Sequence, residues 1–215
     1  DIPGATRSRI PMMDYSQSGE QRFILDYFGD HIGTVLDCGA NDGETFSNSR
    51  ALLMKGWNGV LVDASAEACN RSRSLYRDRP DVEVHNVAIA DRDGWVTLHE
   101  SGPHIGNGDT ALLSSIIEAE TVKWTRTADF KTVTVPCLTI ASLLARSQFK
   151  AFEFITIDVE GMDLVCLQAL DLTALGTAMV IVEVNERDPL PYIDHCAKHG
   201  LVLLTRNAEN LILIR

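Results

Sequence analysis

Short apolar runs alternate with amphipathic segments of helical spacing along most of this chain. Two of the runs, residues 152–158 and 179–184, are strongly apolar and rich in β-branched side chains, which is typical of strands buried on both faces. Such strands occur in parallel sheets whose two faces are covered by helices. The pattern therefore predicts an α/β fold with a mostly parallel sheet.

The expected elements follow one another in the order that crossover connections require. The pattern predicts helices at 20–28, 46–55, 66–76, 139–144 and 162–170, with Ser47 as the N-cap candidate of the second. It predicts strands at 34–38, 59–63, 82–88, 95–99, 133–136, 152–158, 179–184, 201–205 and 211–214, the last two as a hairpin. Five crossover strands and this hairpin give a seven-stranded sheet. The segment 100–132 begins with the polar stretch SGPHIGNGDT, and a loop of this length is usually functional or mobile.

The first expected strand runs into VLDCGANDG, residues 35–43. Gly39 and Gly43 permit a left-handed backbone and leave no Cβ between the main chain and a ligand, so the turn suits a nucleotide cofactor. A dinucleotide site favours G-x-G-x-x-G, and a phosphate-binding P-loop needs a Lys; this turn has neither. Asp37, Asp42 and Glu44 have the right sign for the sulfonium and amino groups of S-adenosylmethionine. The alternative is a turn that only links a strand to a helix.

Ligands of open parallel sheets bind beyond the carboxyl ends of the strands, and here most of these ends carry a carboxylate. Asp63 ends the second strand about 20 residues after the glycine turn, where a carboxylate can accept both ribose hydroxyls. Asn86 and Val87, at the end of the third strand, are placed to border the adenine. Asp158 with Glu160 ends the fourth crossover strand, and Glu183 with Asn185 ends the fifth.

Composition and charge narrow the class of partner. The chain has 215 residues, 45% of them hydrophobic, and a formal charge of −11, which argues against nucleic acid and anionic membranes as partners. Five cysteines without a C-x-x-C pair are typical of reduced core residues in a cytoplasmic protein. No apolar run approaches the length of a membrane span. The oligomeric state is left open.

Four blocks resemble the FkbM-type S-adenosylmethionine-dependent methyltransferases. They are SQSGEQ at 16–21, LDCGANDGETFSNS at 36–49 with KGWNGVLVDAS at 55–65, VEVHNVAIADRDG at 82–94 and FITIDVEGMDLVCLQAL at 154–170. The I-D-V-E-G part is the most specific to the family. Two positions depart from the family pattern: Gln21 replaces an acidic residue, and Ala64 stands where many members have Pro. The resemblance spans nearly the whole chain from residue 16, so we expect residues 1–15 to be an N-terminal extension and 16–215 one methyltransferase domain.

The resemblance implies a Rossmann-like fold, S-adenosylmethionine as donor and O-methylation of a sugar or another small natural-product hydroxyl. It assigns Asp37, Gly39, Asn41 and Gly43 to the methionine end and Asp63 to the ribose. Their neighbours Ala40 and Ala64, together with Asn86 and Val87 from their position at the end of the third strand, complete the expected cofactor-binding residues. The resemblance also implies that Asp158, Glu160 and Gly161 face the transferred methyl group.

Methyl transfer to a hydroxyl needs a base or a metal ion that lowers the pKa of the hydroxyl. Asp158 is the first candidate for the base, with Glu160 or Glu183 in support, and Asp158 and Glu183 are also the candidates for binding Mg²⁺. Glu160 can alternatively accept backbone amides at the start of the next helix. His104 and Asn185 are candidate contacts of the methyl acceptor. Two other functions stay open: a binding module without catalysis, and a NAD-dependent oxidoreductase.

Overall fold

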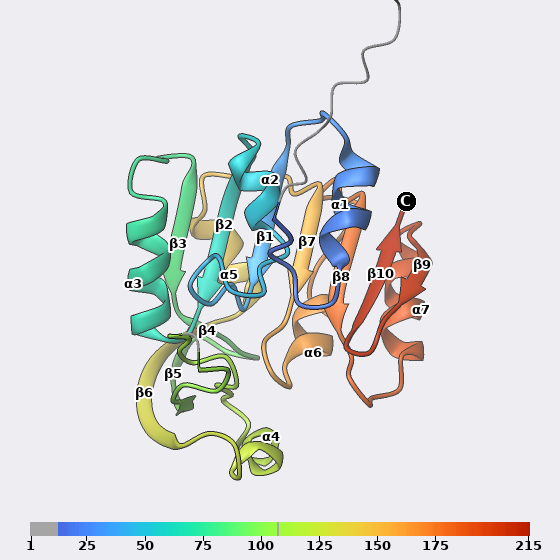
Figure 1. Ribbon diagram of the computed structural model, residues 1–215. Helices are drawn as coiled ribbons and strands as arrows, with labels where there is room; N and C mark the ends of the chain where they lie inside the picture. The colour runs from blue at the N-terminus through green and yellow to red at the C-terminus, as the bar shows by residue number, and fades with distance from the viewer. Residues whose placement is uncertain (1–12, 107) are drawn as a thin grey trace, which may run out of the picture.

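The computed structural model describes residues 13–106 and 108–215, and its main feature is a seven-stranded sheet with the order β3-β2-β1-β7-β8-β10-β9 (Figure 1). Residues 1–12 of the expected N-terminal extension lie outside the described residues. The strands are β1 (Thr34–Cys38), β2 (Asn58–Asp63), β3 (Val82–Asn86), β7 (Phe154–Ile157), β8 (Met179–Glu183), β9 (Val202–Arg206) and β10 (Asn210–Ile214). The first five are mutually parallel, and β10 runs antiparallel to β8 and β9. The predicted α/β class and its closing hairpin are confirmed.

Successive side chains of the central strands point to opposite faces, and both faces are apolar. Leu36 packs in one core with Val60 and Ile155, whereas its neighbour Val35 packs in a second core with Leu61. All five side chains are fully buried. Burial on both faces explains why these strands have continuous apolar sequences instead of alternating ones.

Helices cover both faces. The core that contains Val35 includes residues of α1 (Glu20–Phe28) and α2 (Arg50–Met54), and the core that contains Leu36 includes residues of α5 (Ile140–Arg146), α6 (Asp163–Gln168) and α7 (Leu190–Lys198). α3 (Ala66–Leu75) packs beside β2 and β3. The predicted helix 46–55 is shorter than expected because Phe46 has a left-handed backbone, with φ of 54°. The prediction of Ser47 as the N-cap was wrong, because α2 begins at Arg50 with Ser49 at its N-cap; the Ser47 hydroxyl still accepts the amide of Arg50 at 3.0 Å. The sequence pattern did not predict α7.

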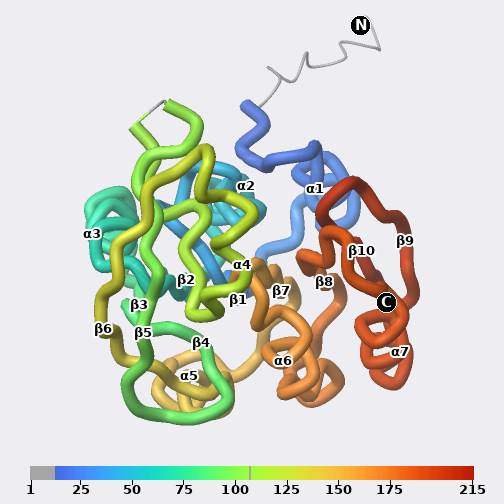
Figure 2. Tube along the Cα trace, turned by 90° about the horizontal axis from the view of Figure 1, so that it is seen from below, coloured from blue at the N-terminus to red at the C-terminus, as the bar shows by residue number. Residues whose placement is uncertain are grey.

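A second, three-stranded sheet, β4-β6-β5, lies beyond the carboxyl ends of the parallel strands (Figure 1). It contains β4 (Ala88–Ile89), β5 (Gly94–Ser101) and β6 (Phe130–Leu138). The predicted strand 82–88 was wrong as one element, because β3 pairs with β2 whereas β4 pairs with β6. The connection from β5 to β6 carries α4 (Glu118–Thr121) and the 3₁₀ helix η1 (Val122–Trp124). Figure 2, which looks onto this end of the sheet, shows that the connection crosses in front of β1 and β2.

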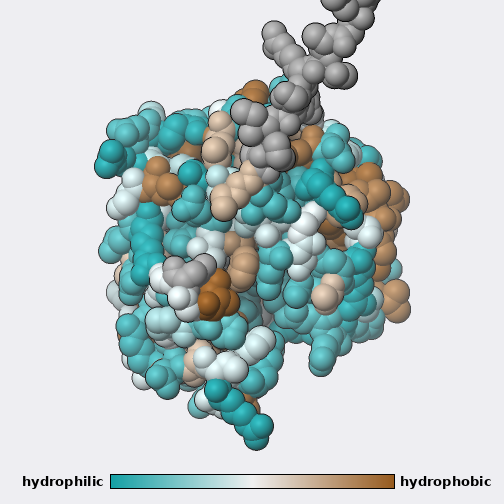
Figure 3. Space-filling model, in the orientation of Figure 1, coloured by the Kyte–Doolittle hydropathy of each residue, from teal (hydrophilic) through white to brown (hydrophobic). Residues whose placement is uncertain are grey.

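On the face drawn in Figure 3 most of the surface is hydrophilic, and apolar residues gather at the edge where β9 lies. Val202, Leu203 and Leu204 of that strand are all exposed. The five cysteines are buried and free, as expected for thiols in the core. No helix in the described ranges is long and apolar enough to cross a membrane.

Candidate functional site

A cavity of about 340 Å³ opens where β1, β2, β7 and β8 end, and it has the size of a small-molecule site. From β1 the chain adds β2 and β3 on one side of the strand, and it then adds β7 and β8 on the other side. Ligands of open α/β sheets bind at the point where this direction changes. Ten residues predicted from the sequence line this cavity: Gly39, Asn41, Asp63, Ala64, Val87, His104, Asp158, Glu160, Glu183 and Asn185. The structure therefore brings together side chains that lie up to 146 positions apart, from Gly39 to Asn185.

Unusual backbone conformations concentrate on the cavity wall. Each non-glycine residue with positive φ in the described chain lines the cavity: Asn41, Phe46, Ala111, Glu160 and Asn185. Their φ angles lie between 46° and 57°. A left-handed non-glycine residue costs on the order of 1–2 kcal/mol and persists only where its surroundings hold it. This clustering supports the cavity as the functional site.

Gly39 joins the ends of three strands. Its amide donates to the Val62 carbonyl at the end of β2, at 2.8 Å. A Cβ at Gly39 would lie 1.7 Å from the carbonyl oxygen of Asp158, at the end of β7. The glycine is therefore required by close packing of two backbones, and this packing brings Asp158 beside the turn. Gly43 does not line the cavity: it packs against Tyr76, whose hydroxyl donates to the Gly43 carbonyl at 2.9 Å.

Replacing Gly39 with alanine is expected to destabilise the fold by about 3 kcal/mol or more, because overpacking is added to the cost of a left-handed alanine. Gly56→Ala is the matched control, since Gly56 also has positive φ but no atom within 4 Å of the added Cβ. Urea denaturation of both variants separates the cost of overpacking from the cost of a left-handed alanine. Equal losses in the two variants would show that the contact with Asp158 relaxes at no cost.

Asp63 ends β2 and faces the cavity with its carboxylate held in place. Its Oδ2 accepts the amide of Asn41 at 2.9 Å, and its Oδ1 accepts the amide of Ser65 at 2.8 Å. Burial raises the pKa of Asp63 to about 6, against the lowering effect of these two bonds. Asn86 does not line the cavity; its amide donates to the carbonyls of Asp63 and Ala64 at 3.2 and 2.9 Å. Asn86 therefore holds the backbone at the end of β2 without lining the cavity.

Asp37 lies behind the glycine turn, not on the cavity wall. It is 5% exposed, and its Oδ2 accepts the hydroxyl of Ser49 at 2.6 Å. Burial raises its pKa to about 7, although the Ser49 bond opposes this shift. Ala40 is also buried, and its amide donates to the Val62 carbonyl at 3.0 Å. Asp37, Ala40, Gly43 and Asn86 thus support the cavity wall, and a direct contact with a cofactor remains a prediction for each.

The buried Asp37 makes stability depend on pH. Its pKa is about 7 in the fold against a usual 3.8, so the folded protein holds an extra proton between these values. Stability therefore falls as pH rises from about 4 to about 7. We expect a lower thermal midpoint at pH 7.5 than at pH 5.5, and a smaller difference in Asp37→Asn. Thermal denaturation followed by circular dichroism measures both, and an equal pH dependence in the variant would contradict this role.

Three carboxylates form a cluster at the other end of the cavity. One oxygen each from Asp158, Glu160 and Glu183 lies within 4.8 Å of the others. Burial raises the pKa of Glu160 to about 7 and that of Glu183 to about 8. The Asp158 side chain is exposed to the cavity, and partial desolvation together with the negative charges of Glu183 and Glu160 raises its pKa as well. Such groups can act as bases near neutral pH. Their spacing also suits a divalent cation, which takes carboxylate oxygens.

Asp163 and Arg187 complete the surroundings of the cluster, and sequence reasoning missed both. Asp163 accepts the amides of Val159 and Gly161 at 2.8 and 3.0 Å, so it holds the turn that was expected to involve Glu160. Glu160 is thereby left to face the cavity. Arg187 lies 2.8 Å from Glu120, 3.6 Å from Asp163 and 3.8 Å from Glu183. Asp163 could have been found from the sequence, because an Asp two residues after a glycine often accepts amides of the turn. No local pattern indicates Arg187.

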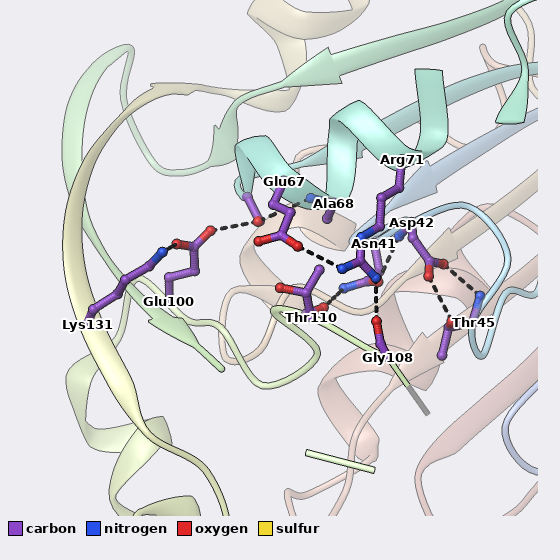
Figure 4. A network of polar contacts seen from close by, with 11 residues as sticks. Asn41, Asp42, Thr45, Glu67, Ala68, Arg71, Glu100, Gly108, Thr110 and Lys131 are labelled. Carbon is purple, nitrogen blue, oxygen red and sulfur yellow. Dashed lines mark hydrogen bonds and ion pairs between the residues drawn. The ribbon is translucent and has the colours of Figure 1, made fainter. Parts of the chain in front are cut away.

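The connection between β5 and β6 covers the cavity and is tied to its rim by polar contacts (Figure 4). The side-chain amide of Asn41 donates to the Thr110 carbonyl at 2.8 Å, and the guanidinium of Arg71 in α3 donates to the Gly108 carbonyl. Lys131 pairs with Glu100 at 2.8 Å. The long polar segment of the sequence thus forms a cover that is fixed to the glycine turn and to α3.

Two aromatic side chains of this cover face the cavity. His104 and Trp124 both line it, and their rings meet edge to face with centroids 5.5 Å apart. The buried His104 Nδ1 and Trp124 Nε1 have no hydrogen-bond partner among the described residues. Buried nitrogens are normally paired, so these two are available to a ligand.

A match to a protein family agrees with this geometry. A family model described as "Methyltransferase FkbM domain" matches residues 37–196, which is more than half of the chain. Comparison with curated proteins gives no match. Among solved structures, monomeric WbdD aligns over 91% of this chain and 40% of its own, with 17% identity and a TM-score of 0.49. The PH0226 protein from Pyrococcus horikoshii OT3 aligns over 89% of this chain and 68% of its own, with 13% identity and a TM-score of 0.36.

This chain therefore spans well under half of the WbdD structure that it resembles. The family match covers the glycine turn, Asp63, the cover and the carboxylate cluster, which are the parts that build the cavity. The chain belongs to the FkbM methyltransferase family.

Proposed function

We propose that this protein is an S-adenosylmethionine-dependent methyltransferase that methylates a hydroxyl oxygen of a sugar or another small natural product. The observation that carries the proposal is the convergence of Asp63, the glycine turn and the carboxylate cluster on one cavity. The FkbM family membership supports methyl transfer, and S-adenosylmethionine is the usual donor of such enzymes. The oxygen as target, and the class of acceptor, belong to the proposal.

The residues of the cavity fit the donor in three ways. Asp63 still has free lone pairs on both oxygens, which can accept the ribose hydroxyls. Val87, Ile89 and Leu98 supply an apolar wall for the adenine. The carboxylates of Asp158 and Glu160 match the positive charge of the sulfonium and amino groups in sign.

In the proposed mechanism, the protein aligns the acceptor oxygen with the methyl carbon and removes the hydroxyl proton. When bound, S-adenosylmethionine supplies an activated methyl group. The Asp158 carboxylate takes the hydroxyl proton, and its raised pKa makes it a stronger base than an ordinary aspartate. Glu183 and Glu160 help to keep this pKa high through their negative charges. His104 and Asn185 line the same cavity and are proposed to contact the acceptor.

Mg²⁺ is the alternative to a base for activating the hydroxyl. Asp158, Glu160 and Glu183 fit a divalent cation by donor type and spacing. In that case the three carboxylates would bind the ion, and the ion would lower the pKa of a coordinated hydroxyl. Loss of transfer in the presence of EDTA, restored by Mg²⁺, would identify the metal route.

The two other functions considered from the sequence are less well supported. Asp42 and Glu44 would repel a pyrophosphate at the glycine turn, which argues against a dinucleotide. A binding module without catalysis would not need three carboxylates with raised pKa values in its cavity. The five buried free thiols support the further proposal that the protein works in the reducing cytoplasm.

A methyl-transfer assay tests the proposal. The purified chain is incubated with S-adenosylmethionine carrying a labelled methyl group and with a panel of neutral, cationic and anionic sugars and small alcohols, with and without EDTA. We expect label on a hydroxyl oxygen of a neutral or cationic acceptor. Label on nitrogen or carbon would contradict O-methylation, and no transfer to any acceptor despite tight donor binding would favour the binding module.

A further inference from the structure

The charge of the cavity wall is entirely of one sign. Five carboxylates line the cavity: Asp63, Asp158, Glu160, Glu183 and Glu209. None of the described residues that line it is a lysine or an arginine. A cavity lined by one sign of charge and enclosed by low-dielectric walls concentrates ligands of the opposite charge.

The nearest positive charges are engaged outside the cavity. Arg187 makes its shortest ion pair with Glu120, at 2.8 Å, and lies 3.8 Å from Glu183. Lys123 also pairs with Glu120, at 3.4 Å. Both cations thus pair with Glu120 in the cover and do not line the cavity, although their charges also lower the pKa of Glu160.

Glu183 provides an independent sign that a ligand group is needed there. Its side chain is only 8% exposed, and its Oε2 has no hydrogen-bond partner among the described residues. A buried carboxylate oxygen left without such a partner is costly. This oxygen lies 3.8 Å from the Arg187 guanidinium, which is too far for a hydrogen bond, so its lone pairs can still accept from a donating or positively charged group on the ligand.

The backbone also fixes where along the cavity this charge acts. Asp63 and Asn41 are joined by a hydrogen bond, and Gly39 packs directly on the carbonyl of Asp158. A molecule with its ribose at Asp63 therefore extends across the glycine turn toward Asp158. The group beyond the ribose then lies beside the cluster.

We infer that this cavity distinguishes the methyl donor from its product by charge, so that S-adenosylmethionine binds more tightly than S-adenosylhomocysteine and methyl transfer itself weakens the hold on the product. The inference rests on the proposed function. In the reaction the acceptor oxygen bonds to the methyl carbon, and the electron pair of the broken carbon–sulfur bond stays on sulfur. The hydroxyl proton passes to a carboxylate. The positive charge on sulfur and one negative charge of the cluster disappear together, so the attraction between them is lost.

Isothermal titration calorimetry at pH 8.5 tests the inference with three probes: S-adenosylmethionine, S-adenosylhomocysteine and sinefungin, which has an ammonium group near the position of the sulfonium. We expect both cationic probes to bind at least about tenfold more tightly than S-adenosylhomocysteine, a difference of about 1.4 kcal/mol.

Glu183→Gln removes one charge while keeping the shape of the side chain. We expect it to reduce the preference for the cationic probes by about fivefold or more and to leave the affinity for S-adenosylhomocysteine within about twofold. Binding of the neutral probe also shows that the variant is folded. Glu67→Gln is the matched control, because Glu67 is an acidic residue of α3 that pairs with Arg71 and does not line the cavity.

The outcomes separate the inference from the proposed function. Equal or tighter binding of S-adenosylhomocysteine in the unaltered protein would overturn the inference and leave the proposed function standing. An unchanged preference in Glu183→Gln would also overturn it. Absence of binding for all three probes would overturn the proposed function and the inference with it.

Discussion

Asp63→Ala is expected to weaken binding of S-adenosylmethionine and S-adenosylhomocysteine by about 100-fold or more, because it removes an ionised acceptor for two ribose hydroxyls. The substitution also releases the amides of Asn41 and Ser65, which the carboxylate holds at 2.9 and 2.8 Å. The loss should therefore be equal for the two ligands, since both carry the same ribose. Calorimetric titration of the variant with each ligand measures it.

Two further variants make this result specific. Asp63→Asn keeps one acceptor oxygen, and we expect a smaller loss than with alanine. Asp42→Ala removes a carboxylate of the same turn that does not line the cavity and accepts the hydroxyl of Thr45 at 2.8 Å. Binding should change little in Asp42→Ala. If Asp63→Ala binds both ligands like the unaltered protein, the ribose lies elsewhere.

Asp158→Asn is expected to reduce turnover by about 10²–10⁴-fold while S-adenosylhomocysteine still binds, because it removes the proposed base and keeps the shape of the side chain. The neutral ligand is the right probe of binding, since the affinity for the cationic donor also depends on the charge of Asp158. The rate of methyl transfer at saturating acceptor, together with calorimetry, measures the two effects separately.

The pH profile distinguishes a base from a merely structural residue. In the unaltered protein the rate should rise with pH through the region where the cluster ionises, because only the deprotonated carboxylate accepts a proton. Asp158→Asn should lose this rise, and Glu160→Gln should keep it. Loss of folding in Asp158→Asn, seen by circular dichroism, would instead assign the residue a structural role.

Much of the fold could be predicted because local sequence and tertiary environment agree in the central strands. Both faces of β1, β2, β7 and β8 are covered by apolar cores, so their runs of apolar residues are unambiguous. The second sheet was harder to predict because β4 has only two residues and pairs with β6, about 50 positions later. No local pattern carries information about such a distant partner.

The residues of the cavity also divide into those that local sequence predicts and those that only the tertiary structure reveals. The ends of parallel strands can be read from the sequence, so Asp63, Asp158 and Glu183 were identified with their place in the fold. Asp37 was assigned to the cofactor from its charge and from the family resemblance; its side chain does not line the cavity and accepts the Ser49 hydroxyl, so contact with a cofactor stays a prediction. Arg187 follows no strand end, and only the tertiary structure brings it to Glu120 and Asp163.

Calorimetric titration of the purified chain with S-adenosylmethionine, S-adenosylhomocysteine and NAD, each with and without Mg²⁺, tests the central claim most directly. We expect micromolar binding of the first two and none of NAD. Binding of NAD without binding of S-adenosylmethionine would contradict the proposed donor, and absence of binding by all three would contradict the assignment of the cavity as a cofactor site.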